Sequence, residues 1–158
     1  GAIMKTENTR ADRILDLLGW ILLIGTLAYL ILGWFSFPDQ IPMHYNGAGE
    51  IDRWGGKGEI IFIEVMMWIF YLGIGVVEKY PQIWNTGVEV TAKNKEKIYR
   101  TLKYMLKTLK FLTALIFAYL IVNSLQSVPL PGWFTPVVVI LVFGDMAFWL
   151  ICLFRIKK

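Results

Sequence analysis

The sequence predicts an all-α integral membrane protein, with four transmembrane helices in an antiparallel bundle and both termini in the cytoplasm. Of its 158 residues, 56% are hydrophobic and only 18% are charged, whereas a soluble domain carries about a quarter charged residues. The apolar residues also form long runs, and residues 17–37 contain no charge. Because about twenty apolar residues span the roughly 30 Å hydrocarbon core as a helix, such a run is long enough to cross a bilayer.

Four spans are predicted along the chain, and each should be helical because backbone groups in lipid must satisfy one another. They cover residues 17–37, 60–77, 106–125 and 133–154. Between the last two spans, Pro129, Pro131 and Gly132 end one helix and turn the chain. The chain is treated as a single membrane domain in which residues 1–3, ahead of Met4, are a cloning remnant.

The distribution of Lys and Arg predicts the orientation, since cytoplasmic loops are enriched in these residues. Fourteen of the sixteen lie near the N-terminus, between the second and third spans including the start of the third, or near the C-terminus. The other two, Arg53 and Lys57, lie in the outer loop, residues 38–59. Topology and anionic lipid headgroups account for the basic residues, so the net charge of +4 does not indicate nucleic-acid binding.

Residues 78–105 are predicted to form a cytoplasmic loop and an interfacial helix. Ile98, Leu102, Met105 and Leu109 recur at helical spacing, while lysines occupy much of the other face. One interpretation is a helix at the membrane surface with snorkelling lysines, which runs into the third span. The other is a docking surface for a cytoplasmic regulator.

The outer loop contains the polar sequence PDQIPMHYNGAGEIDRWGGK. Its prolines disfavour helix in the residues before them, and Asn46-Gly47 favours a tight turn. We therefore expect an ordered, compact loop. Its candidate binding residues are the only histidine and nearby polar and aromatic side chains: His44, Tyr45, Asn46, Glu50, Asp52, Trp54 and Lys57.

Three interpretations of these side chains stay open. They could pair with Arg53 and Lys57 and hold the shape of the loop. His44, Glu50 and Asp52 could bind a divalent cation such as zinc, although their spacing matches no established ligand pattern. The loop could also be a binding face for an extracellular molecule, with its aromatic rings as anchors.

The loop resembles the domain of unknown function in the N-terminal part of SdpI-type proteins, bacterial membrane proteins named for immunity to a sporulation-delaying peptide toxin. The resemblance is carried by Pro38, Ile41-Pro42, His44-Tyr45-Asn46, Gly49-Glu50, Asp52, Trp54-Gly55 and Lys57. It implies a multi-pass protein of the bacterial plasma membrane with an immunity or signalling role. The type member of the family also captures a cytoplasmic repressor, so the resemblance implies this as a further role. Larger members carry further spans and a second characteristic domain.

Charged residues within the spans form a second group of candidates, since an ionisable group in hydrocarbon is costly and by default marks function. Asp145 lies about twelve residues into the fourth span, near the bilayer centre, and its expected partner is Lys110. A structural pair is favoured over a proton relay, which needs a chain of titratable groups. Glu64 is expected in the wet outer zone, where it would extend an acidic patch with the acids of the loop.

From these features we expect a non-enzymatic immunity or sensor protein that binds a secreted peptide toxin, or a similar extracellular agent, through its outer loop. No cofactor is expected. Two alternatives stay open: a metal-dependent membrane enzyme that uses His44, Glu50 and Asp52 with zinc, and a small transporter built around Asp145. The expected partners are membrane lipids, the toxin and a cytoplasmic regulator.

Overall fold

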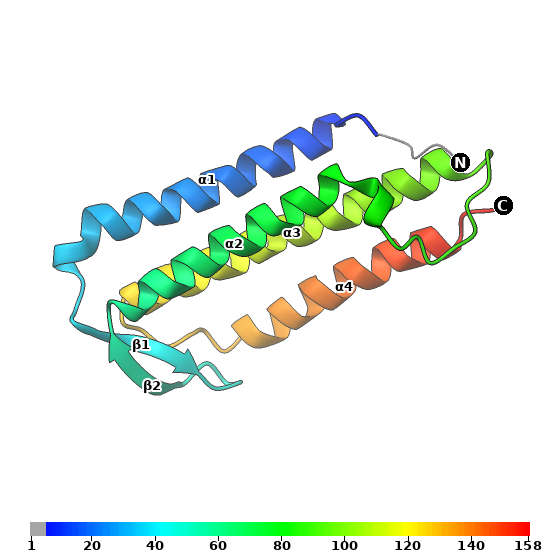
Figure 1. The fold of residues 1–158 in the computed structure, drawn as a ribbon. Helices are drawn as coiled ribbons and strands as arrows, with labels where there is room; N and C mark the ends of the chain where they lie inside the picture. Colours follow the sequence, from blue (N-terminus) through cyan, green and yellow to red (C-terminus); the bar gives the residue numbers. More distant parts are fainter. Residues whose placement is uncertain (1–5) are drawn as a thin grey trace.

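The computed structural model describes residues 6–158, so the interpretation of residues 1–3 lies outside it. The elements are, in order, α1 (Arg10–Gly33), a 3-10 turn (Trp34–Ser36), β1 (Gln40–Tyr45), β2 (Ile51–Gly56), α2 (Glu59–Lys79), a second 3-10 turn (Pro81–Ile83), α3 (Lys95–Leu125) and α4 (Phe134–Phe154). The protein is mostly helical, and its four α-helices are long and apolar enough to cross a membrane. The start of α1 and the end of α4 lie at one end of the molecule, and the two strands lie at the other (Figure 1).

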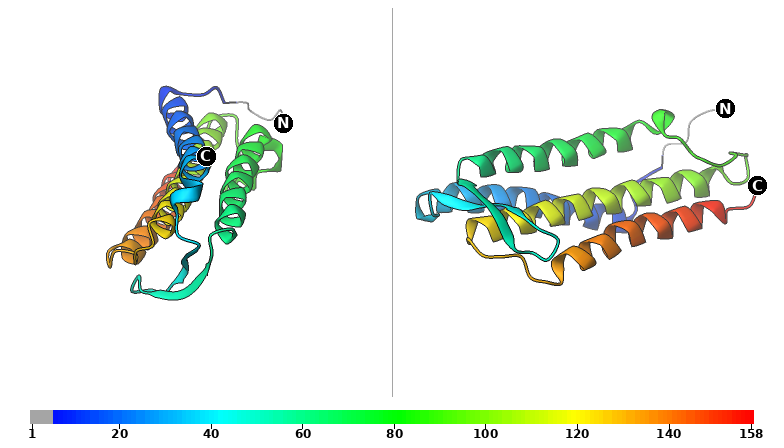
Figure 2. Two further views of the ribbon diagram at one scale, coloured as in Figure 1. Left: turned by 90° about the vertical axis from the view of Figure 1, so that its left-hand side faces the viewer. Right: turned by 90° about the horizontal axis from the view of Figure 1, so that it is seen from below.

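Helix α3 is the element on which the other helices pack. It contacts α1, α2 and α4, whereas α1 and α2 make few contacts with each other, and it runs between α2 and α4 in Figure 2. Its 31 residues form one continuous helix, about 46 Å long at 1.5 Å per residue. The expected interfacial helix is therefore not a separate element but the first part of α3.

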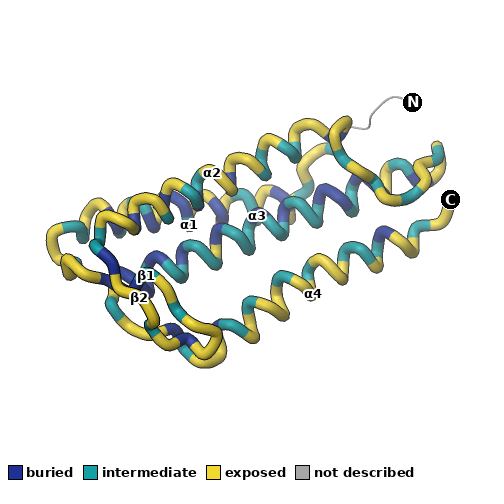
Figure 3. Tube along the Cα trace, turned by 60° about the horizontal axis from the view of Figure 1, so that its bottom comes forward, coloured by how far each residue is buried: buried dark blue, intermediate teal, exposed yellow. Residues whose placement is uncertain are grey.

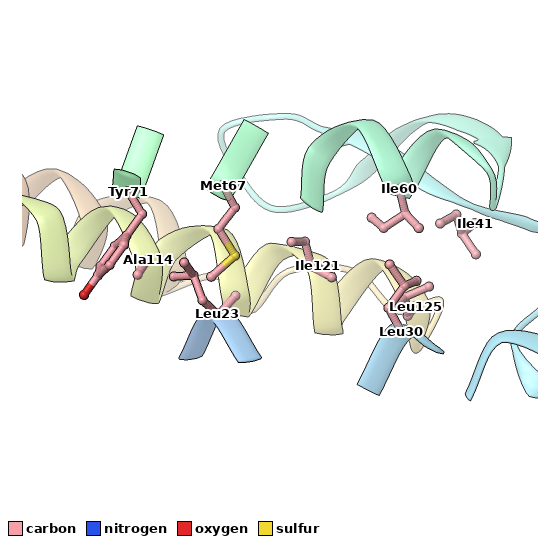
Figure 4. Packing of buried hydrophobic residues seen from close by; sticks show 10 residues of the cluster. Leu23, Leu30, Ile41, Ile60, Met67, Tyr71, Ala114, Ile121 and Leu125 are labelled. Carbon is pink, nitrogen blue, oxygen red and sulfur yellow. The ribbon is translucent and has the colours of Figure 1, made fainter. Parts of the chain in front are cut away.

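Small and aliphatic side chains at helical spacing form the packing face of α3. Ala114, Ala118, Ile121 and Leu125 are all buried on this face. They form one cluster with residues of α1, α2 and β1 (Figure 4), including Leu23, Leu30, Ile41, Ile60 and Met67. The two alanines let neighbouring helices approach closely, which favours association in lipid, where helices gain mainly from packing.

Helix α1 begins seven residues before the predicted span because its first turn is capped. The hydroxyl of Thr9 accepts a hydrogen bond from the backbone N–H of Asp12 (3.2 Å), and the Asp12 carboxylate accepts one from the N–H of Thr9 (2.9 Å). Such a reciprocal cap satisfies two backbone donors at the start of the helix. Arg100 of α3 also donates to Asp12 (2.9 Å), so the cap is tied to the neighbouring helix.

Among the long helices, α4 packs mainly on α3, and most of its surface is exposed or half-buried (Figure 3). Its buried residues are Phe134 and Leu153, near its two ends. The exposed residues between them are almost all apolar, and an apolar exposed surface of this kind suits contact with hydrocarbon.

The outer loop contains a two-stranded antiparallel β-hairpin, an element that the prediction of an all-α fold missed. Its strands pair from Gln40 opposite Gly56 to Tyr45 opposite Ile51, with an irregular register near His44. The compact, ordered loop that its turn-forming residues predicted is present, and its order comes from strand pairing.

Candidate functional site

The turn of the hairpin is organised by the side chain of Asn46. Its Oδ1 atom accepts hydrogen bonds from the backbone N–H groups of Ala48 (3.0 Å) and Glu50 (2.9 Å). Gly49 then adopts φ +90°, a conformation that glycine reaches without a steric cost. Its carbonyl accepts a hydrogen bond from the N–H of Leu130 (2.9 Å), and a Cβ atom at this position would collide with the Leu130 carbonyl. The turn is thus joined to the connection between α3 and α4.

Tyr45 fixes the end of β1 to the end of α3. Its hydroxyl accepts a hydrogen bond from Nδ2 of Asn123 (3.0 Å) and lies 3.1 Å from the hydroxyl of Ser124. Both partners are buried. Ile41, at the other end of β1, is fully buried and packs in the main core beside Ile60 (Figure 4). The hairpin is therefore seated on the helices at several points.

Lys57 has an anchoring position as well. Its Nζ atom donates to the backbone carbonyl of Trp34 (2.6 Å) and lies 4.6 Å from the centroid of the Trp34 ring. These contacts join the end of the hairpin to the end of α1. Of the candidate binding residues, Tyr45 and Lys57 thus hold the hairpin in place.

His44, Asp52 and Trp54 point to solvent. Nδ1 of His44 lies 2.6 Å from Oδ1 of Asp52, and their side chains are 66% and 44% exposed. Trp54 is 52% exposed. Glu50 does not join them, because its carboxylate accepts a hydrogen bond from Nδ2 of Asn46 (3.2 Å). Within residues 6–158, no three His, Cys, Asp or Glu side chains are grouped to hold a metal ion, so the structure does not bring His44, Glu50 and Asp52 together as one ligand set.

A groove of about 370 Å³ lies against β1. The first turns of α2, the end of α3 and the start of α4 supply its apolar walls, and one edge is polar. The walls include Ile60, Ile63, Leu120, Leu130 and Phe134, and His44, Tyr45 and Asn46 form the polar edge. Ligand pockets of about 300–1,000 Å³ with mostly apolar walls and a few polar groups are typical of small-molecule and side-chain recognition.

Glu64 does not belong to an outer acidic patch, because it is buried and only 3% exposed. Its Oε1 atom accepts hydrogen bonds from the hydroxyl of Thr26 (3.2 Å) and from Nε1 of Trp68 (3.1 Å). The sequence-based prediction used the position of Glu64, which lies four residues after the start of the predicted span. This position does not specify the direction in which the side chain points. The face of α2 on which Glu64 lies is turned inward, toward α1.

The expected pair between Lys110 and Asp145 is also wrong. The Asp145 carboxylate accepts hydrogen bonds from the hydroxyl of Thr108 (2.8 Å) and from Nε1 of Trp149 (3.0 Å). Residues two positions apart on an α-helix are separated by about 200° of rotation about the helix axis. Thr108 therefore faces α4, while Lys110 faces the opposite side of α3. These hydrogen bonds connect α3 to α4, and they give Asp145 a structural role.

Lys110 belongs instead to a buried charge cluster, which we define as Asp16, Glu78, Lys107 and Lys110. Nζ of Lys107 lies 2.7 Å from the Asp16 carboxylate and 2.9 Å from that of Glu78. Nζ of Lys110 lies 3.0 Å from each of the same two carboxylates. The two cations and two anions alternate and join α1, α2 and α3. Snorkelling is therefore the wrong interpretation for these lysines.

One feature of the sequence does indicate this cluster, namely the spacing of the lysines along α3. Lys103, Lys107 and Lys110 fall in phase with Ala114 and Ala118, on the stripe that packs against α1 and α2. A lysine stripe that continues an apolar packing face predicts buried cations, and buried cations need carboxylate partners from neighbouring helices.

The comparison with protein families gives one match, which lies on the hairpin and its two flanking helices. Residues 21–68 match the model of a family described as a domain of unknown function (DUF1648). This range includes both strands, the second half of α1 and the first half of α2. The description assigns no activity to the domain. No curated protein and no solved structure matches the chain.

Proposed function

We propose that the protein is an immunity or sensor protein of the bacterial plasma membrane that binds a secreted peptide toxin, or a similar membrane-active agent, through its outer hairpin. In this proposal the four helices form an antiparallel bundle with both ends of the chain in the cytoplasm. Of the fifteen Lys and Arg residues that the structure describes, all but Arg53 and Lys57 lie outside the hairpin and toward the end where α1 begins and α4 ends, which supports this orientation. The resemblance of the hairpin sequence to SdpI-type proteins supports the choice of ligand class.

The observation that carries the proposal is the combination of a firmly seated hairpin with an exposed face and an apolar groove. Tyr45 and Ile41 fix β1 to the helices, while His44, Asp52 and Trp54 stay accessible. An ordered surface loses little conformational entropy when it binds. An exposed tryptophan such as Trp54 is a typical anchor for a peptide, and the groove against β1 offers apolar walls for a second side chain.

Charge also favours a cationic peptide at this end of the molecule. Residues 38–59 contain four acidic and two basic residues, which gives this segment a formal charge of −2 although the whole chain carries +4. Two of the acids, Asp52 and Glu59, have side chains that are 44% and 46% exposed. A local negative charge raises the concentration of a cationic ligand near the hairpin and speeds its association.

The proposal is tested by survival of toxin-sensitive bacteria that express the protein at a confirmed level in the membrane. The wild type should raise survival in the presence of the toxin, and Trp54→Ala and Asp52→Asn should reduce this protection without reducing expression. Lys97→Ala, an exposed substitution far from the hairpin, is the matched control. If cells that express the wild type survive no better than cells with an empty vector, immunity is the wrong function.

One observation supports a second candidate, a metal-dependent membrane enzyme. The Asp52 carboxylate contacts Nδ1 of His44, the arrangement in which a carboxylate orients an imidazole so that Nε2 can ligate zinc. Elemental analysis of protein purified without chelator distinguishes this candidate. The metal-enzyme candidate requires about one zinc ion per chain of the wild type and its loss in His44→Ala. Wild-type protein that is folded but free of zinc would exclude this candidate.

A further inference from the structure

We propose that the cleft between α1 and α2, at the end of the bundle opposite the hairpin, binds the phosphate of an anionic phospholipid. The cleft has a volume of about 820 Å³. It exists because α1 and α2 both pack on α3 but make few contacts with each other. Its lining comes from all three helices and from Thr6 and Asn8, ahead of α1. This site shares no residue with the hairpin, so it stands independently of the proposed function.

Lys103 is the residue that points to an anion. It lines the cleft and is only 8% exposed. Its Nζ atom donates to the backbone carbonyl of Thr6 (2.7 Å), and it forms no ion pair with any carboxylate of the described part of the chain. An ammonium group has three donors and a full charge. A buried ammonium without an ion-pair partner is costly, and an anion in the cleft would supply the direct partner that Lys103 lacks.

The neighbouring charges do not meet this need, because each is already paired. Lys107 and Lys110 are joined to Asp16 and Glu78 in the charge cluster. Asp12 is the carboxylate that pairs with Arg100 (2.9 Å). The lining as a whole holds four lysines and two carboxylates, so its formal charge is +2.

The apolar part of the lining, which comes from both α1 and α2, fits the acyl part of a lipid. It includes Trp20, Leu72 and Val76, which are 40%, 45% and 55% exposed. Lys79, the last residue of α2, lies about 10 Å along the axis from Leu72 at 1.5 Å per residue. A cationic end and an apolar side within this distance match a phosphate with its chains lying along α2. Basic pockets between helices at the cytoplasmic membrane surface bind anionic headgroups in this way.

The test uses the full chain, purified and delipidated in a neutral detergent, and measures the rise in Tm when a lipid is added. A ligand that binds only the folded state raises Tm. We expect phosphatidylglycerol to raise the Tm of the wild type by several degrees more than phosphatidylcholine does. Lys103→Gln should lose at least half of this difference, and Lys97→Gln, an exposed lysine of the same helix outside the cleft, should keep it.

Each variant is compared with its own lipid-free Tm, so a loss of intrinsic stability does not mimic a loss of binding. If Lys103→Gln does not fold, Lys79→Gln at the exposed mouth of the cleft takes its place and should also lose part of the difference. Equal rises with both lipids, or an unchanged phosphatidylglycerol effect in the cleft variants, would overturn the proposal. A rise with millimolar inorganic phosphate equal to that with phosphatidylglycerol would assign the cleft to free phosphate and would also overturn it.

Discussion

The two ends of the molecule both hold charged side chains, but they bury them to very different extents. At the hairpin, the side chains of His44 and Asp52 are 66% and 44% exposed. In the charge cluster, those of Lys107 and Glu78 are 4% and 7% exposed. An exposed ion pair contributes about 0–1 kcal/mol to stability, whereas removal of one partner of a buried pair costs about 3–5 kcal/mol. His44 and Asp52 are therefore free to serve binding, whereas the charged residues of the cluster hold the helices together.

The largest expected effect is that of Lys107→Met. The substitution leaves Asp16 and Glu78 with Lys110 as their only shared cation, so we expect a loss of about 3–5 kcal/mol in the free energy of unfolding. Denaturant-induced unfolding in detergent measures it, with the exposed Lys97→Met as the control. A loss below about 1 kcal/mol would show that the buried cluster does not differ from a surface pair.

A smaller effect is expected for Tyr45→Phe, which removes the hydroxyl that meets Asn123 and Ser124. Because two buried polar groups lose this partner, the free energy of unfolding should fall by about 1–2 kcal/mol. Hydrogen exchange should become faster in β1 and β2 and stay unchanged in α1, because the substitution weakens only the contacts that hold the hairpin on the helices. Tyr80→Phe, at a residue that is 49% exposed, is the control. Unchanged exchange in the strands would mean that Tyr45 does not anchor the hairpin.

The smallest effect on stability is expected for Asp52→Asn. Because its contact with His44 is exposed, the free energy of unfolding should change by less than about 1 kcal/mol. If the proposed function is correct, the same substitution should nevertheless weaken protection against the toxin, since it removes a negative charge from the face proposed to bind it. Unfolding measurements under the conditions used for Lys107→Met provide the comparison. A loss as large as that of Lys107→Met would make Asp52 a structural residue.

The helices were predictable from the sequence because their apolar runs are long, and the compactness of the outer loop was predictable from its prolines and Asn46-Gly47. The strands were not. Gln40–Tyr45 contains a proline and Ile51–Gly56 ends in two glycines, and both residue types are unfavourable in strands. The pairing is stabilised instead by the local turn around Asn46 and by burial of Ile41 against the helices. The second of these is a contact between distant parts of the chain, which the sequence does not show.

The positions of the four long helices along the chain were easier to predict than the direction in which a side chain points. Lys110 and Asp145 were matched by depth, but rotation along α3 directs Lys110 to α1 and α2 and leaves Thr108 facing Asp145. Glu64 was placed by its distance from the start of its span, and its inward direction was missed. Rotation about a helix axis depends on which helices are neighbours, and a single sequence with four similar apolar spans does not specify that.

The most direct test of an outward-facing hairpin is its accessibility from outside intact cells. In a Cys152→Ser background, Gly47→Cys places a thiol at an exposed turn position with open space around its Cβ atom. Lys157→Cys places one near the exposed C-terminus, at the opposite end of the molecule. A membrane-impermeant maleimide should label Gly47→Cys in intact cells and Lys157→Cys only after permeabilisation. Labelling in the reverse order would put the hairpin in the cytoplasm and contradict its proposed role in binding a secreted ligand.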